Sequence, residues 1–384
     1  MNKIKILIQI IILFPIVILL IFIRPIMKIR VGRIESKLIG HMTIQQEIFL
    51  CEKEEGLYDK EREKIVWFHD KEICNHYILN HWKKKMIVLP GYILYPLEVF
   101  FNKFNFTKKF YLNSRNKKKD HHKLLLKYDP FIKFSNQEIL NGDQILAKNN
   151  IEKNDRIVCF ASRSKFYKNE NFESSRNSSI NNQVDSIKFL LDKGFKAVRV
   201  GRSEQEKLKL KDNRVFDYSF SPDKNDFYDL YIISRCSFMI SNESGVNEMA
   251  TIMRIPKLII NYFLFENLKN VNDHLTPIIL PKKIQSIKDN KIITYEDAFK
   301  LDIFSINTVE ELKKKGFCLI ENTKEEISNA VSEMYELIIN KNLNLEMNFN
   351  KQLNFWNKYQ KYYNYIPEKI IISPKFFDLN ENLF

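Results

Sequence analysis

The sequence is poor in glycine and lacks both glycine-rich fingerprints that hold nucleotide phosphates. Only 9 of its 384 residues are glycine, and neither GxGxxG nor GxxxxGK[ST] occurs in it. A phosphate cradle of the Walker type is therefore excluded. A bound nucleotide would have to be held by helix N-termini and arginines.

The cysteines are few and dispersed. The chain has 5 of them, and none forms a CxxC pair: Cys51, Cys74, Cys159, Cys236 and Cys318. An odd, scattered set in a chain of this size indicates free thiols in a reducing compartment. It offers no zinc site, and no metal is expected.

Length and charge limit the class of protein. A chain of 384 residues with 45% hydrophobic content can bury a large core and suggests two domains. The net charge of +14 favours anionic partners: phosphorylated substrates, nucleic acid or an acidic membrane face. Because no recognition helix, finger or aromatic RNA motif accompanies the charge, we expect no specific nucleic-acid partner.

The N-terminus is a continuous apolar segment. From Ile4 to Ile23 only Lys5, Gln9 and Pro15 interrupt it, and at about 1.5 Å per residue it roughly matches a hydrocarbon core. Residues 1–25 are therefore predicted to be a single-pass transmembrane anchor in the inner (plasma) membrane. Basic residues are more numerous after the segment, which places the body in the cytoplasm. The alternative is a helix lying in the membrane interface.

The first half, residues 26–150, alternates strand-like and helix-like patterns. Strands are predicted at 29–34, 64–68 and 86–89, and helices at 42–54, 72–82 and 95–104. This order favours a parallel sheet with helices on both faces. A Lys- and Asn-rich insertion at 105–150 ends the domain.

The second half, residues 151–345, repeats the alternation. The predicted strands are 156–160, 196–200, 214–218, 238–240 and 257–260, the last taken as the final strand of the sheet. The predicted helices include 182–193, 226–234 and 246–253. The aromatic-rich tail, residues 346–384, is predicted to pack back across the domains.

The turn Ser241–Gly245 is the most informative segment. It follows an apolar run and opens a helical pattern. Free amide N–H groups and the helix dipole make such a turn an anion site, although ordinary helix capping also explains it.

Further polar residues follow other strands of this half. Arg163 and Gly201 come after strand ends, and Arg176 with Asn177 lies in the loop after Arg163. Ligands of open α/β sheets bind at the carboxyl ends of strands. Two arginines and one helix N-terminus could neutralise a diphosphate there.

Several short blocks, in their order along the chain, resemble a known family. They are Ile39–Met42, Glu47–Leu50, Ser162-Arg163, Ser175–Asn177, Ala197–Gly201, Asp217–Ser219, Cys236–Ser241 and Ser244-Gly245. Together they are similar to membrane-associated bacterial GT-B glycosyltransferase-like proteins of surface-polysaccharide loci, and more distantly to fucosyltransferase-like enzymes. Relatives end one strand with His-Val-Arg, whereas this chain has Ala161-Ser162-Arg163 and keeps only the arginine.

The resemblance implies an α/β fold of two Rossmann-like domains facing a cleft. It implies a metal-independent transfer of a sugar from a nucleotide-sugar to a glycan, a lipid-linked or another surface-polysaccharide acceptor, with no cofactor. In this interpretation Arg163 holds the β-phosphate and Ser244 and Gly245 hold the other phosphate. Arg176 and Asn177 contact the donor from a loop that closes over it, and Glu243 accepts hydrogen bonds from ribose hydroxyls.

The acceptor hydroxyl needs a general base. His41 is the candidate because an unperturbed imidazole titrates near pH 6.5, and Gly40 beside it lies on the acceptor side. A helix-capping or phosphate-contacting histidine is the alternative. His69 and Asp70, at the next strand end, are the reserve candidates.

Two other functions stay open from the sequence. A sugar-nucleotide epimerase or hydrolase on the same fold would need a pair of catalytic carboxylates, of which only Asp70 is evident. An anchored, non-catalytic protein that binds nucleotide-sugars is suggested by the incomplete His-Val-Arg block.

Overall fold

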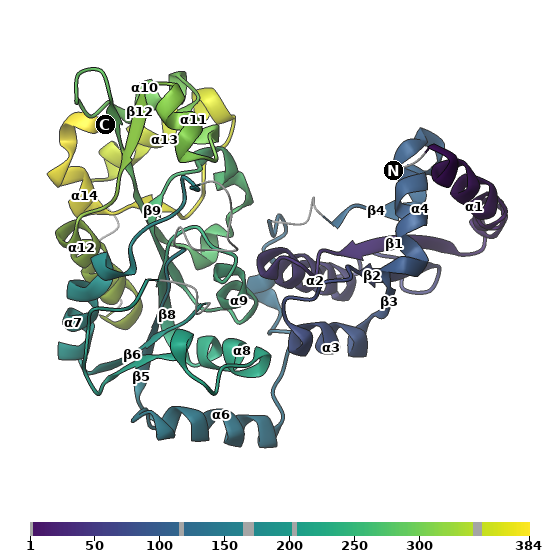
Figure 1. Cartoon of the computed structure of the whole chain (residues 1–384), viewed down its shortest axis with the longest axis horizontal. Coiled ribbons are helices and arrows are strands. Elements are labelled where there is room, and N and C mark those ends of the chain that lie inside the picture. Colours follow the sequence, from purple (N-terminus) through teal and green to yellow (C-terminus); the bar gives the residue numbers. More distant parts are fainter. Residues whose placement is uncertain (1–2, 115–118, 164–172, 202–205, 341–347) are drawn as a thin grey trace. The chain divides into compact units, whose positions relative to one another are not determined.

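The computed structural model describes residues 3–114, 119–163, 173–201, 206–340 and 348–384. The chain divides into two compact units, Met1–Lys133 and Phe134–Phe384 (Figure 1). Helix α6 (Asn136–Lys148) belongs to the second unit. Its Asp143 accepts hydrogen bonds from Tyr231 and Arg235 of that unit. Part of the Lys- and Asn-rich insertion, residues 115–118, lies outside the described residues.

The first unit is a four-stranded parallel sheet with helices. Its elements are α1 (Lys3–Ile23), β1 (Lys28–Ile34), α2 (Ile39–Glu54), β2 (Glu63–His69), α3 (His76–Lys85), β3 (Ile87–Pro90), α4 (Gly91–Lys103), β4 (Tyr111–Leu112) and α5 (Leu124–Lys127). The strand order is β3-β2-β1-β4, and every pairing is parallel. The predicted β-α alternation and the parallel sheet are confirmed for this unit.

The N-terminal helix corrects one prediction. Within the part of the chain that the structure describes, no helix combines the length and apolar character needed to cross a membrane. The predicted transmembrane anchor is therefore not supported. Leu13 and Val17 of α1 are buried in a core cluster that includes Leu97 and Phe101 of α4, so this part of the apolar run packs on protein.

Aromatic side chains fill the space between α2, α3 and the first sheet. Trp67 of β2 is fully buried and meets Phe49 of α2 edge to face, with ring centroids 4.9 Å apart. Gly32 of β1 pairs with Trp67 across the sheet, and a Cβ at Gly32 would lie 2.7 Å from the Trp67 ring. Only glycine therefore lets the indole lie flat against β1.

The second unit is larger and contains a seven-stranded sheet. Its strands in the main sheet are β5 (Arg156–Phe160), β6 (Phe195–Arg199), β7 (Val215–Asp217), β8 (Cys236–Ser241), β9 (Lys257–Tyr262), β10 (Ile278–Pro281) and β13 (Ile371–Ile372). Its helices include α6, α7 (Val184–Asp192), α8 (Asp226–Ser234), α9 (Asn247–Ile252), α10 (Tyr295–Lys300), α11 (Val309–Lys314), α12 (Lys324–Tyr335), α13 (Phe349–Tyr363) and α14 (Pro374–Leu379). Strands β11 (Lys283–Ser286) and β12 (Phe317–Ile320) form a separate antiparallel pair.

The order of the large sheet is β13-β10-β9-β8-β5-β6-β7, with parallel pairing throughout. The α/β class is thus confirmed, but β9 is not the last strand as predicted. Strand β10 extends the sheet beyond it, and β13, from near the C-terminus, pairs with β10. These strands are only four and two residues long, so their apolar pattern is too short to recognise in the sequence.

The C-terminal aromatic residues belong to the core of the second unit. Phe355, Trp356 and Tyr359 of α13 are buried together with Phe265 and Phe299. The hydroxyl of Tyr359 donates to the carbonyl oxygen of Phe265 at 2.9 Å. These tail residues therefore complete the core of the second unit, whereas Phe349 and Tyr362 are exposed.

In each sheet the chain adds strands first on one side of a central strand and then on the other side. In the first unit the chain goes from β1 to β2 and β3 on one side and returns to add β4 on the other. In the second it goes from β5 to β6 and β7 and then adds β8 on the other side of β5. The carboxyl ends of strands beside such a switch point form the usual ligand crevice of open α/β sheets.

Candidate functional site

The switch point of the second unit is organised by Asn242, which directly follows β8. Its Oδ1 accepts a hydrogen bond from the backbone N–H of Arg163 at 2.7 Å, and its Nδ2 donates to the carbonyl oxygen of Arg176 at 2.7 Å. The same Nδ2 lies 3.1 Å from Ser178 Oγ. One buried amide thus joins the loop after β8 to both arginine-bearing segments of the loop after β5.

The strand ends around this amide are aligned by backbone hydrogen bonds. Ala161 N–H donates to the carbonyl of Ile240, and Val200 N–H donates to the carbonyl of Phe160, each at 2.9 Å. The residues that follow β5, β6 and β8 therefore emerge at one edge. Gly201, after β6, has φ of 125°, a conformation that favours glycine.

The Ser241–Gly245 turn opens a shorter helix than the predicted one at 246–253. The helix that follows it, α9, has only six residues. Ser241 Oγ donates to Asn247 Oδ1, and Asn247 Nδ2 donates to the carbonyl of Asn242 at 2.9 Å. Ser241 is thus engaged in fixing the turn, while Ser244 and Gly245 lie half-buried at its tip.

The side chain of Glu243 is turned toward the next strand end. Its Oε2 accepts hydrogen bonds from the backbone N–H groups of Phe263 at 2.8 Å and Leu264 at 3.1 Å. Burial raises the pKa of Glu243, while these two amides and the charges of Arg176 and Lys282 act in the opposite direction. This carboxylate therefore ties β8 to the segment after β9.

Lys282 brings another cation to this edge of the sheet. It follows β10, is 2% exposed, and its Nζ donates to the carbonyl oxygens of Ser175 at 2.8 Å and Asn177 at 2.6 Å. Burial lowers the pKa of Lys282 to about 8, against the opposing effect of Glu321, Glu243 and Glu173. The ammonium group thus fixes the segment that carries Arg176 and Asn177.

The structure brings together most of the predicted donor-binding residues. Arg163, which is buried, and Arg176, which is half-buried, are both held by Asn242. These contacts hold the backbone of both arginines. The charges of Arg176 and Lys282 also act on Glu243, so two cations and one carboxylate lie together near the ends of β8 and β10, with the backbone of Arg163 fixed beside them. Gathered cations of this kind suit a phosphorylated ligand.

The switch point of the first unit carries His41. This residue lies in the first turn of α2, after Gly40, and is partly exposed. Its Nδ1 lies 2.9 Å from Oε2 of Glu35, a buried carboxylate one residue after β1. Gln45 Nε2 lies 2.8 Å from the same ring nitrogen. Both contacts fall on Nδ1. In the tautomer that satisfies Glu35, whose carboxylate only accepts, the proton is on Nδ1 and Nε2 keeps its lone pair.

His69 and Asp70 lie at the end of the neighbouring strand. His69 pairs with Ile34 of β1, and its Nδ1 lies 2.7 Å from the carbonyl oxygen of Asp70. Asp70 Oδ1 accepts hydrogen bonds from Arg33 Nε at 3.0 Å and Nη2 at 2.5 Å. The aspartate is therefore engaged in an ion pair with two hydrogen bonds from one guanidinium group, which makes it a poorer candidate for the general base.

Three site residues were missed by sequence reasoning: Glu35, Asn242 and Lys282. Glu35 and Lys282 each follow a strand directly, which is a usable signal once the strand is recognised. Asn242 stands inside the singled-out turn. Its role depends on Arg163, 79 residues earlier in the chain, which no local pattern reveals.

Comparison with known proteins gives fold likenesses only. No family model matches the chain, and no curated protein matches it. Among solved structures it is similar to ADP-heptose heptosyltransferase II of E. coli (11% identity, TM-score 0.39, covering 60% of this chain and 84% of that one). It is also similar to a glycosyl transferase of family 9 from Veillonella parvula (9%, 0.40, 61% and 80%).

A third similar structure is a putative UDP-N-acetylglucosamine 2-epimerase from Listeria monocytogenes (10% identity, TM-score 0.36, covering 89% of this chain and 92% of that one). All three TM-scores lie below 0.5. The functional interpretation therefore depends on the chain's own residues.

Proposed function

We propose that this protein is a glycosyltransferase that moves a sugar from a nucleotide-sugar to a glycan, lipid-linked or other surface-polysaccharide acceptor. The observation that carries the proposal is the Asn242 network at the switch point of the second unit. It holds Arg163 and Arg176 at the edge where α/β sheets bind ligands. Fixed cations there would stabilise the charge that develops on a leaving diphosphate.

The reaction assigns separate roles to the two units. The acceptor oxygen attacks the anomeric carbon, and the bond from that carbon to the diphosphate oxygen breaks. The nucleoside diphosphate leaves with the electron pair, and the proton of the acceptor hydroxyl passes to Nε2 of His41. Glu35 holds the protonated Nδ1 edge and stabilises the imidazolium that forms, as a carboxylate does in triad arrangements.

No metal is required in this proposal. Arg163, Arg176 and Lys282 supply the positive charge that a divalent ion would otherwise bring to a diphosphate. Transfer should therefore continue unchanged in the presence of a chelator such as EDTA.

The first test is calorimetric binding of UDP-, GDP-, ADP-, CMP- and TDP-sugars to the full chain. We expect selective binding of one nucleotide, with affinity reduced at least about tenfold in Arg163→Ala and Arg176→Ala. Arg62→Ala, which removes an exposed arginine of the first unit, is the matched control and should bind like wild type. Absence of binding across the whole panel would contradict the proposal.

Turnover separates an enzyme from a binding protein. His41→Ala should keep donor binding and lose transfer by about 10²–10⁴-fold. Undiminished transfer by this variant would remove His41 from the role of base. Donor binding by wild type without any transfer to a range of acceptors would instead favour a non-catalytic nucleotide-sugar-binding protein.

A further inference from the structure

The side of α1 that faces away from α4 is apolar. From Ile12 to Ile23 every residue is apolar, and within this stretch only Leu13 and Val17 are buried, in the core cluster shared with α4. The large side chains that are exposed in this stretch or just after it, called here the α1 surface, are Ile12, Phe14, Ile16, Ile18, Leu19, Ile21, Phe22 and Ile26. A contiguous exposed apolar surface of this kind marks an interaction site.

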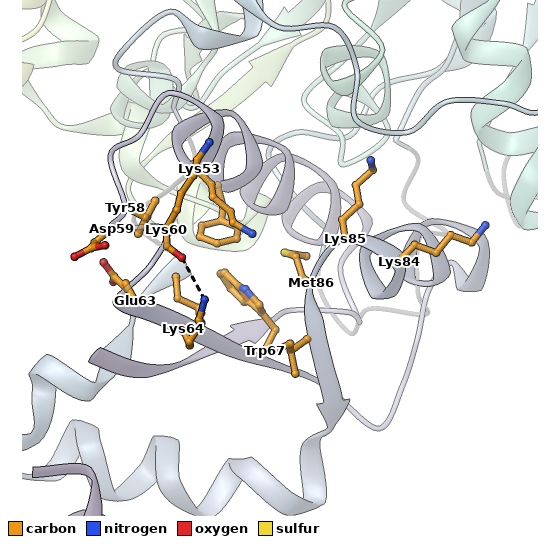
Figure 2. A pocket seen from close by; sticks show the side chains of 13 residues that line it. Lys53, Tyr58, Asp59, Lys60, Glu63, Lys64, Trp67, Lys84, Lys85 and Met86 are labelled. Atoms are coloured by element: carbon orange, nitrogen blue, oxygen red, sulfur yellow. Dashed lines mark hydrogen bonds between the residues drawn. The ribbon is translucent and has the colours of Figure 1, made fainter. Parts of the chain in front are cut away.

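The α1 surface differs from the other face of the same sheet. Successive residues of a strand point to opposite faces. In β2, Phe68 joins the core cluster of α1 and α4, whereas Trp67 packs against Phe49 of α2. On the Trp67 face, the side chains around a pocket between α2, α3 and the sheet include charges of both signs (Figure 2): Lys53, Asp59, Lys60, Glu63 and Lys64. The α2 side is thus adapted to water, and the α1 side is not.

Basic side chains lie at the end of the α1 surface. Arg24 directly follows α1, and its guanidinium lies 5.6 Å from the centroid of the Phe110 ring. The ammonium group of Lys109 lies 5.4 Å from the same centroid. The end of α1 therefore adjoins the 3₁₀ helix η1 (Asn105–Phe110), on which Lys108 and Lys109 are exposed.

The charge of the segments that form this region has one sign. Residues 1–34, which contain α1, and residues 99–119, which contain η1, include no aspartate and no glutamate. An anionic partner is therefore favoured. The side chains of the α1 surface can form no hydrogen bonds, whereas protein interfaces carry about one hydrogen bond per 100–200 Å². A bilayer with anionic headgroups requires none from them, because its hydrocarbon covers apolar side chains and its phosphates face the cations.

We propose that the α1 surface binds a lipid bilayer with anionic headgroups, with α1 lying along the membrane plane. Leu13 and Val17 hold the helix against α4, so its outer side chains enter the bilayer interface by about 5–10 Å. Arg24, Lys108 and Lys109 then meet headgroup phosphates. The first unit takes the place of the polar face that an isolated interfacial helix would have. This proposal depends on neither the donor site of the second unit nor the proposed general base.

The first test is flotation of the full chain with two kinds of vesicle: phosphatidylcholine alone, and phosphatidylcholine with about one-third phosphatidylglycerol. We expect binding to the anionic vesicles to be at least about tenfold tighter than to the neutral ones, and to weaken as the salt concentration rises. Equal binding to both kinds would overturn the role of the basic residues. Absence of binding to the anionic vesicles would overturn the proposal, and self-association of the chain in sedimentation would then assign the α1 surface to a second copy.

One pair of variants tests the apolar contact. F22E/I26E changes the two most exposed side chains of the α1 surface, which are 77% and 76% exposed, so the fold should tolerate it. Binding to the anionic vesicles should weaken at least about tenfold, because two large apolar groups no longer enter the interface. The matched control is L301E/L379E, at exposed leucines of the second unit, which should bind like wild type. Equal affinity of the two variants would contradict the proposal.

A second pair tests the charges. K108Q/K109Q should weaken binding to the anionic vesicles by about 5- to 30-fold. K313Q/K314Q, at two exposed lysines of α11, should bind like wild type. Wild-type affinity in K108Q/K109Q would overturn the contact of these lysines with headgroups. Nucleotide-sugar binding should be unchanged in all four variants, which keeps this test separate from that of the proposed function.

Fluorescence quenching by brominated lipids reports the depth of α1. Phe14, which is 51% exposed, lies near the middle of the helix. In Phe14→Trp, the fluorescence gained over wild type should be quenched more by lipids brominated near the headgroup than by lipids brominated near the chain ends, because the helix lies in the interface. Stronger quenching by the lipids brominated near the chain ends would place the middle of α1 at the bilayer centre and refute the in-plane orientation.

Discussion

Asn242 and Arg163, 79 positions apart in the chain, are joined by a 2.7 Å hydrogen bond from the backbone N–H of Arg163 to the side-chain oxygen of Asn242. This contact links the segments that follow β5 and β8, the two strands at the switch point. The geometry of the candidate donor site therefore depends on one buried amide.

Replacing that amide should affect stability and binding together. Asn242→Ala leaves the Arg163 N–H and the Arg176 carbonyl without their side-chain partner, which should lower the free energy of unfolding by about 2–4 kcal/mol. Nucleotide-sugar affinity should fall as well, because both arginines lose their support. Urea unfolding and calorimetry measure the two effects. Asn141→Ala, an exposed site on α6, is the control. Wild-type affinity in Asn242→Ala would show that the network does not shape the site.

Glu35 should act as a positioning residue for His41. Glu35→Gln keeps the size of the side chain but removes the charge that holds the protonated Nδ1 edge. We expect kcat to fall roughly 10- to 100-fold with little change in KM, a smaller loss than removal of the base itself. Steady-state kinetics at fixed pH measures the split.

The control for this variant is Glu54→Gln, which removes an exposed carboxylate at the end of α2, the helix that carries His41. Its kcat should equal that of wild type. A rise in KM with kcat unchanged in Glu35→Gln would assign Glu35 to acceptor binding instead.

Lys282 should make stability depend on pH in the alkaline range. Its pKa is about 8 in the folded protein because burial lowers it from 10.5. Between these values the unfolded chain binds more protons than the folded one, so the free energy of unfolding rises with pH. The contribution is fully present above about 10.5 and is lost as the pH falls through about 8.

The measurement is urea unfolding of wild type and Lys282→Met at pH 7.5, 8.5 and 9.5. The difference between them should move in favour of wild type by roughly 1 kcal/mol per pH unit across this window. Lys313→Met, at an exposed lysine, should show a constant difference. A constant difference for Lys282→Met as well would mean that its ammonium group titrates normally.

Gly142→Ala should destabilise the second unit. Alanine normally favours a helix over glycine by about 1 kcal/mol, but a Cβ here would lie 2.2 Å from the ring of Tyr231. Tyr231 is fixed by its hydrogen bond to Asp143 at 2.6 Å, so it cannot yield without cost. We expect a loss of about 1–3 kcal/mol in unfolding free energy. An increase in stability would show that α6 moves away from α8.

Local pattern was enough to predict most of the elements. Strand β1 was predicted at 29–34 and spans Lys28–Ile34, and helix α8 was predicted at 226–234 and spans Asp226–Ser234. Long apolar runs and helical periodicity are properties of neighbouring residues. Strands β10 and β13 were not predicted because a run of two to four residues shows no clear alternation in the sequence. It becomes a strand by hydrogen bonding to the neighbouring strand of the sheet.

The pattern of residues along the chain was enough to predict the α/β alternation, the positions of Arg163, His41 and the Ser241–Gly245 turn near strand ends, and that of Arg176 in the loop after Arg163. The connections among these residues became visible in the folded protein: Asn242 binds the backbone of Arg163 and Arg176, and Lys282 binds the backbone on both sides of Arg176. The tertiary structure also decided that the N-terminal apolar helix packs Leu13 and Val17 on α4. The physical reason is distance along the chain, since periodicity records neighbours whereas a buried hydrogen bond joins segments that only the folded sheet brings together.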